Sequence, residues 1–168
     1  MPDTEEREAA ETKAKRDRVF LVVVDDSPER GVALRYACLR ARKGGGRMAL
    51  LRVVEPAGMV EWAGVGAMMA EERREEAEKL LSALAAEVNE ITGGYPILLI
   101  REGEPREELL ALLEEDPRIS ILVLAMAPGG GGPGPLITAL TGRQAHRLRV
   151  PMTLVPGTLD EAELDRVT

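Results

Sequence analysis

Residues 19–37 read VFLVVVDDSPERGVALRYA, and the order of the parts in this stretch indicates the fold class. It opens with VFLVVV at 19–24, a short apolar run that is typical of a strand buried on both faces. The polar turn DDSP follows, and KGGG at 43–46 is expected to end the helix after it. Between these two signals, small and apolar residues recur at helical spacing: Leu34, Ala37, Cys38 and Ala41.

The same succession of an apolar run and a helical pattern recurs along the chain. Five strands alternating with four helices predict a three-layer α/β/α domain, because right-handed crossovers place helices on both faces of an open, five-stranded parallel sheet. Residues 55–70 hold three glycines and a proline without a clean period, and they predict a mobile loop. The four further strands are expected at 48–54, 96–102, 119–126 and 151–156, and the later helices near 77–91, after Pro105 and near 136–148.

Composition restricts the classes of protein that fit. The 168 residues are 45% hydrophobic, which suits one globular domain, and the net charge of −7 argues against nucleic-acid binding. One cysteine excludes an intrachain disulfide, and the sequence shows no membrane-spanning run and no secretory signal near its first residues. We expect a cytoplasmic protein with a charged arm at 1–17, a domain at 18–157 and an acidic tail at 158–168.

Two turns carry the residues that fit a ligand site. In open parallel sheets, ligands bind beyond the carboxyl ends of the strands, where the strand order reverses. VDDSPE (24–29) follows the first expected strand, and APGGGGPG (127–134) follows the fourth. A glycine run lets several backbone N–H groups converge on an anion, but it also serves as a flexible connection.

The first turn, with its helix, resembles a known family. VDDSPERGVALRYA (24–37) is similar to the universal stress protein pattern V-D-G-S-x-x-S-x-x-A-L-x-x-A, with Asp26 where glycine is common. Residues 50–56, 102–125 and 149–156 resemble later parts of that family in the same order, with Arg52 where a histidine is common. The resemblance implies the adenine nucleotide alpha hydrolase-like fold, with strand order 3-2-1-4-5. It also implies a homodimer formed through the last strand, 151–156.

Nucleotide-binding members of that family carry G-x2-G-x9-G-[ST] after the fourth strand. Gly129, Gly132 and Gly142 match this spacing, with Arg143 in the final position. Counting from the neighbouring strands instead puts four other residues at these positions: Ala125, Pro128, Thr138 and Ala139. The resemblance thus implies an ATP site, with magnesium, whose candidate residues are Asp25, Val53, Gly129, Gly130, Gly131, Gly132, Thr138 and Arg143.

Other interpretations of these residues stay open. Asp26 has capping-box spacing with Glu29 and is predicted to cap the first helix, and Asp25 would either cap it or contact a ribose. No positioned general base is evident, so at most a slow ATPase is expected, with no catalytic residue and no metal ligand assigned. The alternative function is a dimeric stress module that binds unknown protein partners instead of a nucleotide. Trp62 and the methionines at 59, 68 and 69 are expected either to close over a ligand or to pack at a partner interface.

Overall fold

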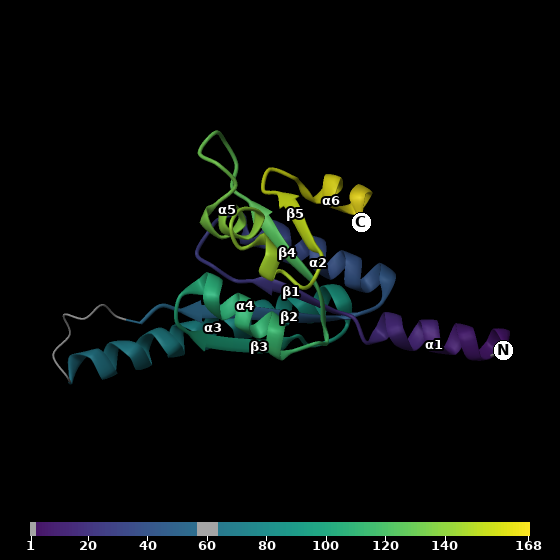
Figure 1. The fold of residues 1–168 in the computed structure, drawn as a ribbon, viewed down its shortest axis with the longest axis horizontal. Coiled ribbons are helices and arrows are strands. Elements are labelled where there is room, and N and C mark those ends of the chain that lie inside the picture. Colours follow the sequence, from purple (N-terminus) through teal and green to yellow (C-terminus); the bar gives the residue numbers. More distant parts are fainter. Residues whose placement is uncertain (1–2, 57–63) are drawn as a thin grey trace.

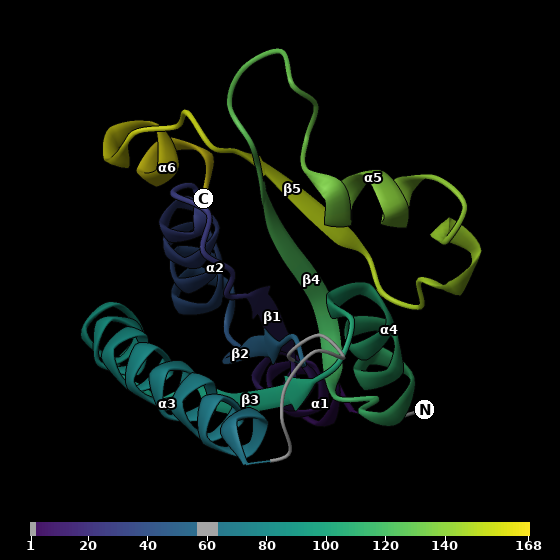
Figure 2. The ribbon, with the colours of Figure 1, turned by 90° about the vertical axis from the view of Figure 1, so that its left-hand side faces the viewer.

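A computed structural model describes residues 3–56 and 64–168, without the side chains of residues 15 and 16. Its five-stranded parallel sheet has the order β3-β2-β1-β4-β5, as the resemblance implied, and helices cover both faces (Figures 1 and 2). The strands are β1 (Val19–Val23), β2 (Arg47–Val54), β3 (Ile97–Glu102), β4 (Ile119–Met126) and β5 (Met152–Pro156). The helices are α1 (Thr4–Arg16), α2 (Arg30–Gly44), α3 (Val65–Thr92), α4 (Pro105–Glu115), α5 (Pro135–Thr141) and α6 (Glu161–Val167), with a 3-10 turn at Ala145–Arg147.

Alternate side chains of the strands fill two cores. Phe20, Val22 and Val24 point to the layer formed by α2 and α3. Val19 and Leu21 point to the opposite layer, formed by α4 and α5. Both cores consist mainly of aliphatic side chains, and among the described residues Phe20 is the one aromatic residue that is buried, which agrees with the low aromatic content of the chain.

The connections place a reversal of strand order beside β1. From β1 the chain crosses through α2 to β2 on one side, and β4 lies against the other side of β1. The turn after β1 and the long connection after β4 therefore meet at the same end of the sheet (Figure 2). This is the position at which open α/β sheets bind ligands.

The structure corrects the expected loop at 55–70 in part. Helix α3 begins at Val65, so residues 65–70 are helical, whereas residues 57–63 with Met59 and Trp62 lie outside the described residues. Glycine at 64 and 66 and the absence of a clean apolar period obscured this helix start. The helix expected near 136–148 is also shorter, because α5 ends at Thr141 and only a 3-10 turn follows Gly142.

The segment after Gly157, expected as an acidic tail, contains a helix that packs on the domain. Asp160 and Glu163 form a capping box that starts α6, with side chain to backbone distances of 2.8 and 3.0 Å. Leu164 is 2% exposed and belongs to the core beside α2. Lys43 Nζ donates to the carbonyl oxygen of Asp165 at 3.2 Å, which further attaches α6 to α2.

Candidate functional site

A cavity of about 170 Å³ lies at the reversal point, between the turn after β1 and the start of α5. Val23, Leu124 and Ile137 form apolar walls from β1, β4 and α5. Its polar lining comes from the turn after β1 and the first residue of α2: Asp25, Ser27, Glu29 and Arg30. The cavity therefore combines an apolar interior with a small group of charged and hydroxyl side chains, as small-molecule sites commonly do.

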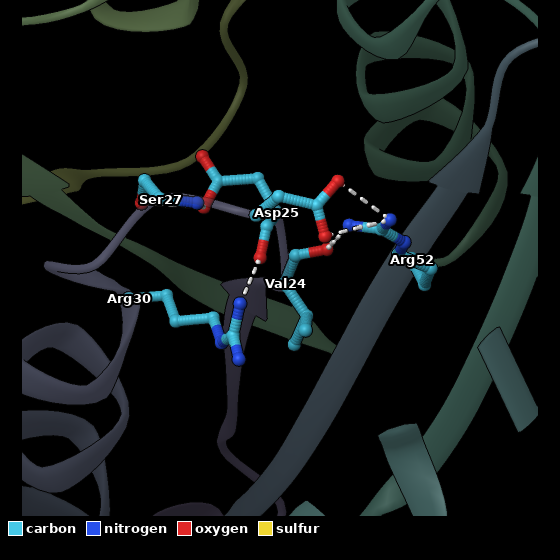
Figure 3. Close-up of polar contacts among 6 residues, drawn as sticks. Val24, Asp25, Ser27, Arg30 and Arg52 are labelled. Carbon is cyan, nitrogen blue, oxygen red and sulfur yellow. Dashed lines mark hydrogen bonds and ion pairs between the residues drawn. The ribbon is translucent and has the colours of Figure 1, made fainter. Parts of the chain in front are cut away.

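The turn after β1 is ordered by its own side chains. Asp25 Oδ1 accepts hydrogen bonds from the Ser27 backbone N–H, at 3.0 Å, and from the Ser27 hydroxyl, at 2.5 Å. Arg30 Nη1 donates to the backbone carbonyl of Asp25 at 3.0 Å, so the guanidinium lies beside this turn (Figure 3). These contacts fix one carboxylate and one guanidinium at the rim of the same cavity.

Asp26 does not cap α2, which corrects the prediction made from its spacing with Glu29. The helix begins at Arg30 without a side-chain cap. The Asp26 carboxylate instead accepts from Arg52 Nη2, at 3.0 and 2.9 Å, while Arg52 Nη1 donates to the Val24 carbonyl at 3.1 Å (Figure 3). Arg52 therefore joins the carboxyl ends of β1 and β2. Both residues occupy positions where the sequence departs from the family pattern.

The glycine run extends away from the sheet as a narrow loop (Figure 2). The Ala127 N–H donates to the Pro133 carbonyl at 3.3 Å and closes the base of this loop. Gly129 and Gly132 have φ values of +94° and +95°, a region that favours glycine. A Cβ atom built on any residue from Gly129 to Gly132 would meet no heavy atom within 4 Å. The four glycines therefore lie in open space next to the cavity and do not line it.

The other predicted site residues lie on β2, within α5 and beyond the end of α5. Val53 is on β2 and packs against the core on the α4 and α5 side. The Thr138 hydroxyl donates within α5 to the Gly134 carbonyl at 2.8 Å. Arg143 is exposed beyond the end of α5. Of the predicted set, the structure brings Asp25 into the cavity lining, and the others do not line it.

The residue that the sequence analysis missed is Arg30. Its position in the turn pattern is normally serine, so this cation replaces a hydroxyl at the start of α2. A guanidinium offers several N–H donors in a planar fork and binds phosphate or carboxylate groups well. Within the parts of the chain that the structure describes, no cluster of three His, Cys, Asp or Glu side chains could hold a metal ion, and no helix is long and apolar enough to span a membrane.

Together these features define an open α/β domain with a small polar cavity at its topological switch point. The sequence model of the universal stress protein family matches residues 18–156, and the chain belongs to this family. No curated protein matches the sequence.

Solved structures share the fold at low sequence identity. Universal stress protein UspA from Lactobacillus plantarum is 17% identical, with a TM-score of 0.69 over 83% of this chain and 98% of that one. A family member from Arabidopsis thaliana with AMP bound is 14% identical, with a TM-score of 0.56 over 87% of this chain and 94% of that one. A universal stress protein in complex with cAMP is 16% identical, with a TM-score of 0.51 over 84% of this chain and 98% of that one.

Proposed function

We propose that this protein binds an adenine nucleotide at the carboxyl ends of β1 and β4 and responds to it as a cytoplasmic stress protein. The observation that carries the proposal is the cavity at the switch point, with Asp25 and Arg30 on its rim. Two structural neighbours were solved with AMP and cAMP, which supports an adenine nucleotide as the class of ligand.

In the proposed orientation, the nucleotide contacts Asp25 and β2 with its adenosine end and the glycine loop with its phosphates. Asp25 Oδ1 is engaged by Ser27, and its second oxygen is available to accept from a ribose hydroxyl. The Val53 backbone contacts the adenosine end. The phosphates reach the N–H groups of Gly129–Gly132, with Thr138 and Arg143 beside them and magnesium offsetting the nearby carboxylates.

Arg30 adds a cation to this set. The cavity of about 170 Å³ is smaller than the roughly 300 Å³ at which ligand sites usually begin, so a nucleotide would extend out of it towards the glycine loop. Arg30 lines the cavity together with Asp25 and with Gly134 at the base of that loop, where a guanidinium can pair with an α-phosphate. We expect this protein to hydrolyse the bound nucleotide at most at a slow background rate.

Calorimetry with ATP and magnesium tests the proposal through a matched pair of variants. Arg30→Ala should weaken binding by roughly tenfold or more, which is the cost of about one charged hydrogen bond. Arg143→Ala, on an exposed residue outside the cavity, should weaken it less. Gly132→Val should impair binding while the sheet still folds, because the strain that valine meets at a φ of +95° is confined to an exposed loop outside the core. No heat from the unaltered protein at millimolar ATP would overturn nucleotide binding.

The assembly that we propose is a homodimer through β5. This strand is the outer strand of the sheet on its side and offers one row of backbone groups for pairing. Light scattering at tens of micromolar protein should show a dimer, and a monomer under these conditions would contradict it.

A second candidate function, binding of a protein partner without nucleotide, is favoured by one observation. Val65 and Met68, on the first turn of α3, are 56% and 68% exposed. Large apolar side chains that are adjacent and exposed are typical of interaction sites. If calorimetry detects no nucleotide binding and the dimer still forms, binding of a protein partner replaces nucleotide binding as the proposed function.

A further inference from the structure

Helix α1 has an uneven distribution of charge along its length. Asp3 precedes it, and its first turns carry Glu5, Glu6 and Glu8 against the single cation Arg7, whereas Glu11 and Lys13 lie further along. Every side chain of residues 3–14 is exposed, and α1 extends away from the rest of the domain (Figure 1). A helix of 13 residues without a packing partner is only marginally stable in water. This helix therefore gains stability from any surface that covers it.

A group of arginines lies at the base of α1, at the amino ends of three strands. Arg18, Arg47 and Arg118 line a hollow of about 620 Å³ together with Ala14 and Asp17. They are neighbours because the parallel strands start side by side, and the Arg47 N–H donates to the Arg18 carbonyl at 2.7 Å.

Two of these arginines have no carboxylate partner among the described residues. The Arg18 guanidinium donates to the Gly44 carbonyl at 3.2 Å, and Arg47 is exposed. Arg118 is paired with Asp116 at 2.7 Å. Three arginines and one carboxylate, Asp17, line the hollow, and this excess of positive charge in a chain of net charge −7 favours an anionic partner.

We propose that α1 is a homotypic contact, in which the acidic end of α1 from a second copy of this chain docks on the arginine hollow. A shallow groove already runs along one face of α1, with acidic side chains at one end, small side chains in the middle, and one lysine and one aspartate further on. It is lined by Glu5, Glu8, Ala9, Thr12, Lys13 and Asp17.

In an antiparallel pair of α1 helices, the acidic end of each copy faces the arginine hollow of the other. When Ala9 lies against Thr12 of the partner, the small side chains allow close approach and Glu8 lies opposite Lys13 of the partner. At 1.5 Å per residue, the first turn then reaches the partner's Arg18 and Arg47. The same contact repeats about the two-fold axis, as an isologous interface requires, and the two helix dipoles oppose each other.

The charges make this contact dependent on salt. Single exposed ion pairs contribute little, so the association rests on several pairs acting together. It involves the amino edge of the sheet, opposite the carboxyl edge that holds the proposed nucleotide site, and none of the residues that line the hollow belongs to β5. In a protein that already dimerises through β5, it would join dimers into larger assemblies.

Sedimentation velocity at about 20 mM and about 500 mM salt tests the proposal, because the Debye length shortens several-fold between them. We expect the particle mass at low salt to be at least about twice that at high salt. Glu5→Lys with Glu8→Lys should abolish this doubling. The matched control, Glu72→Lys with Glu90→Lys on α3, makes the same change in net charge at exposed positions and should preserve it.

A mixing experiment separates the contact from a folding defect. Lys13→Glu with Arg47→Glu should also abolish the doubling, since acidic ends would then face acidic residues. An equimolar mixture of the acidic-end and basic-end variants should restore the doubling, because both contacts of the mixed pair become complementary. Failure of the mixture to associate would overturn the proposal. So would an unaltered protein of the same mass at both salt concentrations, or loss of the doubling on addition of inorganic phosphate without any effect of the α1 variants.

Discussion

Replacing Leu164 by alanine tests whether α6 is an integral part of the domain. Leu164 is 2% exposed and packs in the core beside α2. The substitution removes about 2.4 kcal/mol of transfer free energy, at about 0.8 kcal/mol for each buried methylene equivalent. Buried leucine to alanine changes cost about 2–5 kcal/mol when the cavity remains, and a terminal helix of seven residues can relax to fill part of it. We therefore expect a loss of about 2–3 kcal/mol in the free energy of unfolding.

Urea denaturation followed by circular dichroism measures this loss. Val167→Ala, at a half-exposed position of the same helix, is the matched control and should change the free energy of unfolding by less than about 0.5 kcal/mol. In a chain of this size, each kcal/mol corresponds to about 2–4 °C in Tm, so thermal melts should separate the two variants clearly. Equal stability of Leu164→Ala and the unaltered protein would refute the docked position of α6.

Three further changes have defined outcomes. Deletion of residues 1–17 should change the free energy of unfolding in about 0.5 M salt by no more than about 0.5 kcal/mol, because the side chains there are exposed. Gly46→Ala should destabilise the protein by about 1–3 kcal/mol, because Gly46 has a φ of +136° and a Cβ atom would lie 2.8 Å from the Phe20 ring. The hydrogen bond from Arg147 lowers the pKa of Glu107 below its ordinary value of 4.5, so its stabilising effect is present above that pH and is lost as the pH falls through the lowered pKa. Glu107→Gln should therefore be less stable than the unaltered protein near pH 6, and the difference should shrink towards pH 3.

Each of the three has an outcome that would contradict it. A loss of more than 1 kcal/mol on deletion would show that the arm contacts its own domain. Unchanged stability of Gly46→Ala would show that the backbone there adopts another conformation. A stability difference for Glu107→Gln that is constant from pH 6 to pH 3 would show that the carboxylate and Arg147 do not interact.

The sheet could be predicted because its signals are local. Each buried strand is a short apolar run, and each later helix shows its own period, so the five strands and their parallel arrangement follow from the sequence. The strand order came from the resemblance, since no local pattern specifies which strands are neighbours. Helix α6 was missed because its single buried leucine, Leu164, is surrounded by acidic residues, although Asp160 and Glu163 already had capping-box spacing.

The site was less predictable because its contacts are not local. Asp26 had the spacing of a helix cap, and its actual partner, Arg52, is 26 positions away on the next strand. Helix α2 starts at Arg30, which lines the cavity, whereas the capping-box spacing of Asp26 with Glu29 predicted an earlier start. The positions of the glycines depend on how the loop leaves the sheet, which their sequence spacing does not determine.

The central claim is that an adenine nucleotide binds at the carboxyl ends of β1 and β4. Backbone amide NMR of the uniformly labelled protein, titrated with AMP and then with ATP and magnesium, tests it most directly because it reports both binding and location. The account predicts saturable shift changes in the turn at 25–30 and in residues 124–138, with little change in α1 or α6. The absence of shifts at millimolar nucleotide, or shifts confined to other parts of the chain, would contradict it.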